Sequence, residues 1–327
     1  MHAGLRRLVP LAIAAGACLT PVTAGADRFE RLWKQDMRVA TVAYRLSVAG
    51  AALCRSATVP QSGIVLHSAV QYGLSDAAAA AHGIGDRPTV LGVVAGSPAD
   101  RAGLSAQDEV LAIDDAPAGT SVNAAKTLLA DALGRGVAWL LVAGPSGRRQ
   151  IRFHAAPGCP TDVEVLTNPR INAWADGARV TITTGIVQAT RSDDELAIVI
   201  AHEMAHNILR HCAPSGAEGA ASALLPAARS GGAALAMRAM EEQADRFAVG
   251  ITEAAGYDLA PAVPFLRRLL AETGIAKHAA DTHPSGDRRV ALLTAAIAQT
   301  LERSAQRRPA RRIAGNTSAS ARVSGKM

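Results

Sequence analysis

The chain has 327 residues, enough for two domains, and 49% of them are hydrophobic although only 3% are aromatic. Its net charge of +6 comes from the two ends: residues 1–26 carry two arginines and no acid, and residues 303–327 carry seven basic residues and no acid. Without these ends, residues 27–302 have a net charge of −3. The composition therefore gives no support for a nucleic-acid-binding core.

The N-terminus has the features of an export signal. The basic pair Arg6-Arg7 precedes a mostly apolar stretch over residues 8–22, and Ala24-Gly25-Ala26 fits a small-x-small cleavage site. We therefore predict a signal peptide over residues 1–26 and a mature protein in the periplasm. The alternative is a lipobox ending at Cys18, which would anchor the protein to the membrane through a lipid. No run of 18 apolar residues occurs, so the sequence predicts no transmembrane span.

A β-rich module is predicted over residues 61–157. Its most informative stretch is Ser97-Pro98-Ala99-Asp100-Arg101-Ala102-Gly103-Leu104, which lies between two strand-like segments. This stretch resembles the core of a bacterial PDZ domain, except that Gln107 stands where such domains usually have glycine. The resemblance implies a second helix over residues 122–133 and closing strands over residues 137–142 and 150–154.

The PDZ resemblance also implies a class of partner. PDZ domains add an extended C-terminal peptide to the edge of their sheet and hold its carboxylate with backbone N–H groups. Tyr72-Gly73-Leu74 is a weak match to such a carboxylate loop. We therefore expect protein or peptide partners that bind through their C-termini, and we place the end of the module near Pro157-Gly158.

Two cysteines bracket the predicted module. Cys54 lies in the N-terminal segment, residues 27–60, and Cys159 lies just beyond the module. In an oxidising compartment these thiols are candidates for a disulfide that would tie the ends of the module together. Pairing with Cys212, or three free thiols, are the alternatives at this point.

A short strand is predicted over residues 178–184. Val180, Ile182 and Thr184 alternate with other side chains at the spacing of one strand face. We expect this segment to be an edge strand that holds an extended peptide substrate by strand addition.

The most informative motif is His202-Glu203-Met204-Ala205-His206. Ser192 begins an S-x-x-E capping box and an apolar helical pattern follows, so the motif is expected in the middle of a helix. Histidines four residues apart then point the same way and can share one metal ion, and Glu203 can take a proton from a metal-bound water. The alternative is an ordinary core helix with two hydrogen-bonded histidines. His211 is out of register for a third ligand, and we expect it to face solvent.

A catalytic zinc ion needs a third protein ligand. Glu241 and Asp245 lie four residues apart on a second predicted helix, so their carboxylates share one face. A carboxylate of this helix would complete a site with two histidines, and Asp245 could accept the second N–H of a ligand histidine. The alternative is a solvated acidic helix face.

Three motifs in this order resemble the HtpX-type gluzincin family, which also includes the BepA-like periplasmic proteases and the CAAX-prenyl endopeptidases. The family pattern is H-E-x-x-H, then E-x-x-A-D, then T-H-P with a later arginine. Residues 202–206, 241–245 and 282–284 carry these motifs, and Arg289 follows at the expected distance. The resemblance covers about residues 165–300.

The resemblance also implies a role for each site residue. Glu203 is the general base, and Asp245 and Arg289 support the metal ligands. His283 stabilises the oxyanion, with a loop histidine as the alternative, and Glu242 is a neighbour of the third ligand. The implied ligands of a single Zn²⁺ are His202, His206 and Glu241.

The expected fold is α+β: a mainly helical zincin metalloprotease domain with a small β-sheet over residues 160–302, preceded by the β-rich PDZ-like domain. We expect an exported zinc metalloendopeptidase that cleaves envelope or misfolded proteins captured by the PDZ-like module. The alternative is a non-catalytic PDZ-type chaperone or adaptor with a latent zinc site. Residues 213–236 are either a mobile lid or a loose insertion, and we expect the tail, residues 303–327, to be disordered.

Overall fold

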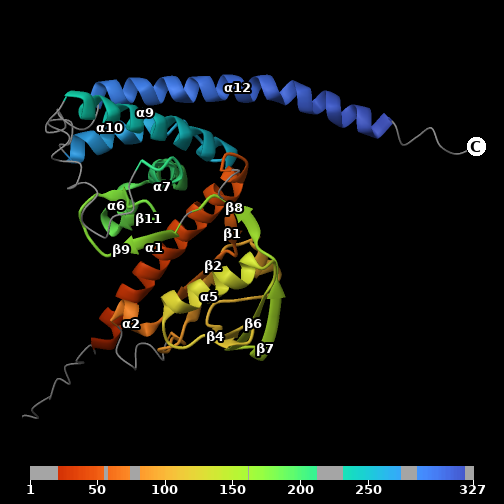
Figure 1. Ribbon diagram of the computed structural model, residues 1–327. Helices are drawn as coiled ribbons and strands as arrows, with labels where there is room; N and C mark the ends of the chain where they lie inside the picture. The colour runs from red at the N-terminus through yellow and green to blue at the C-terminus, as the bar shows by residue number, and fades with distance from the viewer. Residues whose placement is uncertain are drawn as a thin grey trace, which may run out of the picture.

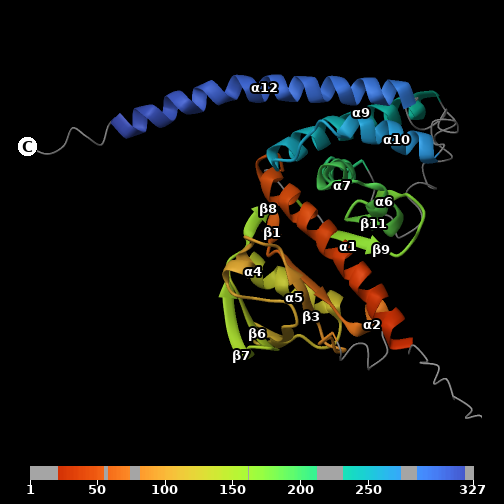
Figure 2. The ribbon, with the colours of Figure 1, turned by 180° about the vertical axis from the view of Figure 1, so that it is seen from behind.

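Helix α1 (Pro21–Ala49) connects the two halves of the molecule. It lies between a sheet-rich half and a helical half in both views of the computed structural model (Figures 1 and 2). The structure describes residues 21–54, 58–73, 82–160, 162–211, 231–273 and 286–320.

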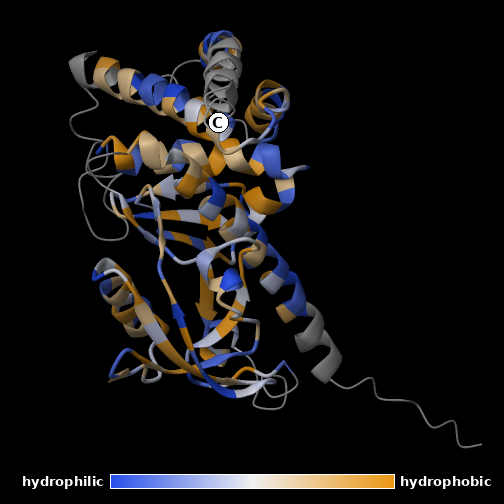
Figure 3. Ribbon diagram, turned by 90° about the vertical axis from the view of Figure 1, so that its right-hand side faces the viewer, coloured by the Kyte–Doolittle hydropathy of each residue, from blue (hydrophilic) through white to orange (hydrophobic). Residues whose placement is uncertain are grey.

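The sheet-rich half has a six-stranded sheet with one helix packed on it. Its elements are β2 (Ile64–His67), α2 (Ala69–Tyr72), β3 (Thr89–Val93), α4 (Pro98–Arg101), β4 (Glu109–Ile113), β5 (Ala116–Pro117), α5 (Val122–Gly134), β6 (Ala138–Gly144) and β7 (Gly147–Phe153). The strand order is β2-β3-β4-β6-β7, and β5 pairs with β4. Along β7, buried Ile151 and Phe153 alternate with exposed Arg152, and the strands show this mixture of hydrophobic and hydrophilic residues (Figure 3). Leu129 of α5 belongs to the same core as these buried strand residues.

The elements implied by the PDZ resemblance are present, because α5, β6 and β7 lie close to the predicted bounds. Gln107 has a φ of 69°, a left-handed conformation that glycine adopts without steric cost. Its backbone N–H donates to the Val90 carbonyl at 2.9 Å, so the left-handed turn forms here with a side chain in place of glycine.

The predicted carboxylate loop at Tyr72 is wrong. Tyr72 ends α2, and its hydroxyl donates to Asp36 of α1 at 2.6 Å. The Gly73 N–H donates to the Ala69 and Val70 carbonyls of α2 itself, so it is not free for a peptide carboxylate. Leu74 lies outside the described residues.

The residues predicted to form a separate N-terminal segment belong to both cores. The first half of α1 places Phe29, Trp33 and Met37 against the outer face of β2 and β3. The second half buries Val42 and Leu46 completely in the core of the helical half. A Cβ atom on Gly92 of β3 would lie only 2.7 Å from Met37, so glycine permits this close approach.

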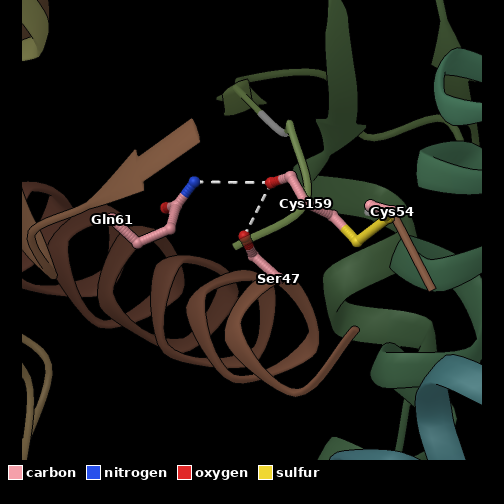
Figure 4. The surroundings of a disulfide bond; sticks show 4 residues. All are labelled: Ser47, Cys54, Gln61 and Cys159. Carbon is pink, nitrogen blue, oxygen red and sulfur yellow. Dashed lines mark hydrogen bonds between the residues drawn. A yellow bond between two sulfur atoms is a disulfide. The ribbon is translucent and has the colours of Figure 1, made fainter. Parts of the chain in front are cut away.

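The sheet-rich half is inserted between α1 and the rest of the helical half, and the two connections are fastened together. After η1 (Gly50–Ala52), strand β1 (Val59–Gln61) pairs with β8 (Ala156–Gly158), and the predicted disulfide joins Cys54 to Cys159. The Cys159 carbonyl also accepts hydrogen bonds from Ser47 at 2.7 Å and Gln61 at 3.4 Å (Figure 4).

The helical half contains a three-stranded sheet and several packed helices. Its elements are β9 (Asp162–Leu166), β10 (Ala173–Ala175), β11 (Arg179–Thr183), α6 (Thr184–Ala189), α7 (Asp193–Ile208), α9 (Gly231–Ala254), α10 (Ala262–Thr273) and α12 (Gly286–Ser320). The strand order is β10-β11-β9, with β10 antiparallel and β9 parallel to β11. Helices α7 and α9 pack against each other, and α12 lies along α9 before it extends beyond the rest of the molecule (Figure 1). The α+β fold agrees with the prediction.

The C-terminal tail differs from the prediction over most of its length. Residues 303–320 continue α12 as a helix, where the sequence predicted disorder. Alanine and arginine are good helix formers, and they extend a helix whose first turns are already anchored by Val290 and Leu293 in the core. Adding residues to an existing helix needs no new nucleation. Among the described residues, no helix is both long enough and apolar enough to span a membrane.

Candidate active site

The helix that carries the H-E-x-x-H motif begins where the sequence predicts it. The Ser192 hydroxyl accepts a hydrogen bond from the Glu195 N–H at 3.3 Å. The buried Glu195 carboxylate in turn accepts from the Arg191 N–H and from Arg268, each at 2.7 Å. These bonds fix the first turn of α7, and the motif follows in its second half.

The structure brings the three predicted metal ligands together. His202 and His206 lie one turn apart on α7, and Glu241 reaches them from α9. The Nε2 atoms of the two histidines are 3.1 Å apart, and Glu241 oxygens lie 3.4 Å from His202 Nε2 and 3.5 Å from His206 Nε2.

These distances fit a tetrahedral metal ion. Zinc bonds of about 2.0–2.1 Å in a tetrahedral arrangement separate neighbouring ligand atoms by about 3.3–3.4 Å. One donor atom from each of His202, His206 and Glu241 lies within 4.8 Å of the others, and each side chain is 12% exposed. Two imidazoles and one carboxylate also leave the fourth position open, as a catalytic zinc site requires.

Asp245 lies directly behind the first ligand histidine. Its Oδ1 is 2.9 Å from His202 Nδ1, on the side of the ring opposite Glu241. Arg289 of α12 donates to both oxygens of Asp245, at 3.3 and 3.4 Å. A carboxylate at this position fixes the tautomer and the orientation of a ligand histidine, and Arg289 holds that carboxylate in turn.

The charged groups around the two ligand histidines shift their pKa values in opposite directions. Burial and the charge of Arg289 lower the pKa of His202, but hydrogen bonds to Asp245 and Glu241 outweigh them and raise it to about 10. Burial raises the pKa of Asp245, but the charge of Arg289 and the bond with His202 lower it to about 2. Asp245 is therefore ionised. At His206, by contrast, burial and the charge of His202 lower the pKa to about 4.

Glu203 and Glu242 lie in different surroundings. Glu203 is half-buried beside His202. Burial lowers the pKa of Arg289, but the negative charges of Asp245, Glu241 and Glu203 raise it above its usual value. Glu242 is instead 3.2 Å from the exposed Arg288. Glu241 thus faces the two histidines, whereas its neighbour Glu242 does not.

His211 is not the solvent-facing residue that the sequence predicted. It is half-buried, and its Nδ1 lies 3.2 Å from Nδ1 of His206. Its Nε2 lies 3.2 Å from Oε1 of Gln243 on α9. The helical register excludes His211 as a ligand, but it gives no information about contacts made after the helix has ended.

The predicted substrate-binding residues are also misplaced. Strand β11 is the central strand of its sheet, so it has no free edge. Val180 and Ile182 are completely buried in the core, and Thr184 is buried in α6, where its hydroxyl donates to the Asn168 carbonyl. Alternation along one strand shows two faces but does not identify the neighbouring strands, which is why the edge assignment failed.

Several predictions concern parts of the chain outside the described residues. They are His283 with its T-H-P motif, Cys212, Cys18 with most of the signal peptide, and residues 213–230 of the glycine-rich connection.

Comparisons with known proteins agree with this geometry. Residues 146–297 match the model of peptidase family M48, and residues 89–144 match the model of the PDZ domain. Residues 146–297 are thus similar to an M48 peptidase domain. This protein is also similar to the mitochondrial metalloendopeptidase OMA1 of Arabidopsis thaliana, with 30% identity over 172 residues. The match covers 46% of this chain and 35% of that relative, so the chain spans about a third of the length of the curated protein it matches.

The two adjacent glutamates of α9 give a direct test of the ligand set. We expect Glu241→Gln to lose most of its bound zinc, because it replaces a charged ligand oxygen facing both histidines. Glu242→Gln is the matched control, and it should keep about one zinc per chain because its partner is Arg288. Atomic absorption measures the zinc content of both variants after dialysis. Equal zinc contents, or more zinc in Glu241→Gln than in Glu242→Gln, would contradict this assignment.

Proposed function

We propose that this protein is an exported zinc-dependent metalloendopeptidase that hydrolyses peptide bonds of envelope or misfolded proteins. The observation that supports it most directly is the convergence of His202, His206 and Glu241, with Glu203 beside them in an M48 domain. Glu203 favours a catalytic role, because a purely structural metal site has no use for a general base.

The residues of the site divide the chemistry among them. A bound zinc ion supplies a Lewis acid that lowers the pKa of a water molecule and polarises the scissile carbonyl. Glu203 accepts the proton of the attacking water and delivers it to the leaving amine. Asp245 accepts a hydrogen bond from the Nδ1 N–H of His202, and Arg289 keeps Asp245 in place. His283 remains our candidate for stabilising the oxyanion, by resemblance alone.

The edge strand β10 is the better candidate for holding an extended substrate. The Thr183 N–H donates to the Asn172 carbonyl, and the Asp176 N–H donates to the Arg179 carbonyl. Because bonding alternates along an antiparallel pair, the backbone groups of Ala173 and Ala175 point away from β11. An extended peptide can pair with them beside α7, which packs against β10.

We propose that the PDZ domain captures the substrate through a C-terminal peptide. Strand β2 is the outer strand of its sheet and lies near α5, which is the arrangement to which PDZ domains add a peptide strand. Helix α1 covers the opposite face of β2 and β3 through Trp33 and Met37, so the edge next to α5 is the side that a peptide would enter.

Export to the periplasm is part of the same proposal. The Cys54–Cys159 disulfide supports it, because such bonds persist in oxidising compartments. Membrane attachment through a lipid on Cys18 is the alternative location.

Glu203→Gln tests the catalytic proposal. We expect wild-type protein to cleave casein and the variant to cleave it at least about 100-fold more slowly, because the general base is lost. Both should hold about one zinc per chain, and Glu242→Gln should cleave like wild type. If wild type and variant both held zinc and neither cleaved casein, the binding-protein alternative would be favoured instead.

A pair of peptides tests the capture proposal. Fluorescent decapeptides ending in an apolar residue should bind the full chain as free acids, and their C-terminal amides should bind much more weakly, because the PDZ groove holds a carboxylate. Fluorescence anisotropy measures both affinities. Equal binding of acid and amide, or no binding by any member of a varied peptide set, would contradict C-terminal capture.

A further inference from the structure

The second ligand histidine has an outer partner of a different kind from that of the first. His202 Nδ1 faces the buried carboxylate of Asp245 at 2.9 Å. His206 Nδ1 faces Nδ1 of His211 at 3.2 Å, and the two rings are edge to face with centroids 5.2 Å apart. Nε2 of His211 then lies 3.2 Å from Oε1 of Gln243.

The chain turns sharply to make this contact. Helix α7 ends at Ile208, and Arg210 adopts a left-handed φ of 57°, which reverses the backbone. The N–H of His211 then donates to the carbonyl of His206 at 2.9 Å. The backbone bond and the turn at Arg210 therefore bring residue 211 next to His206, and they do not depend on the side chain at position 211.

The contacts allow one consistent set of protons. A neutral histidine that binds a metal through Nε2 carries its proton on Nδ1. His206 must then donate, so Nδ1 of His211 is the acceptor and the His211 proton lies on Nε2. Oε1 of Gln243 accepts that proton, which gives a continuous chain of hydrogen bonds from His206 to α9.

We propose that His211 is a positioning residue that fixes the tautomer and the orientation of His206, and that Gln243 fixes His211 in the same way. The inference rests on the proposed zinc site and adds a second, neutral support to it. His202 is held by a carboxylate and Arg289, whereas His206 is held by an imidazole and an amide. Outer partners of this kind raise metal affinity by restricting the ligand to its binding orientation.

The matched variants His211→Asn and His211→Leu isolate the acceptor. Asparagine places Oδ1 where histidine has Nδ1, two bonds from Cβ, and this oxygen can accept the His206 proton. Leucine has nearly the same shape and no acceptor. Both variants keep the backbone bond to His206 and both lose the contact with Gln243, so the acceptor is the difference between them.

We expect His211→Leu to raise the zinc Kd of the full chain about 10–100-fold, measured by competition with a chelator. It should also change the visible absorption of the Co²⁺-substituted protein and lower kcat for casein at saturating zinc. His211→Asn should stay close to wild type in all three measurements. His154→Leu, an exposed histidine of the sheet-rich half, controls for the loss of an imidazole.

Two results would overturn the inference in distinguishable ways. Equal zinc Kd values and equal Co²⁺ spectra for the Asn and Leu variants, with zinc bound normally by wild type, would remove the role of His211 and leave the proposed function intact. Absence of zinc from wild-type protein would overturn the proposed function, and the role of His211 with it.

Discussion

The site depends on the packing of α7 against α9. Two histidines on one helix offer a metal only two ligands, and the third ligand, Glu241, comes from a helix whose N-terminal end is separated from α7 by more than 20 residues of sequence. Alanines of both motif segments, Ala205 and Ala244, are completely buried. Small side chains let helices approach closely, and the same close approach sets Asp245 behind His202 and Gln243 against His211.

Helix α1 extends this constraint to the sheet-rich half. Its two halves are buried in different cores, and Arg38 in its middle donates to the Val187 carbonyl of α6 and to the carbonyl of Ser192, the N-cap of α7. The disulfide joins the chain segment that enters the inserted PDZ domain to the segment that leaves it, near the end of α1. The PDZ domain is thus attached to the helical half along α1 as well as at a linker, which favours a defined orientation between the two halves.

Local patterns in the sequence were sufficient for the residues on α7 and for much of the PDZ domain. Helical spacing relates His202 to His206, and turn residues define the strands around Ser97. Glu241 needed the family resemblance, because spacing alone leaves a solvated acidic face as a good alternative. The double role of α1 has no local signature, since its partners Leu91 and Ser192 are distant in sequence. His211 was missed because its contact depends on the backbone reversal at Arg210.

A crystal structure of the zinc-loaded protein, with diffraction recorded at the zinc absorption edge, would show directly which residues bind the metal. We expect one anomalous peak about 2.0–2.2 Å from Nε2 of His202, Nε2 of His206 and an oxygen of Glu241. A peak bound by Glu242 or His211 in place of one of these residues, or no peak between α7 and α9, would show that this ligand assignment is wrong.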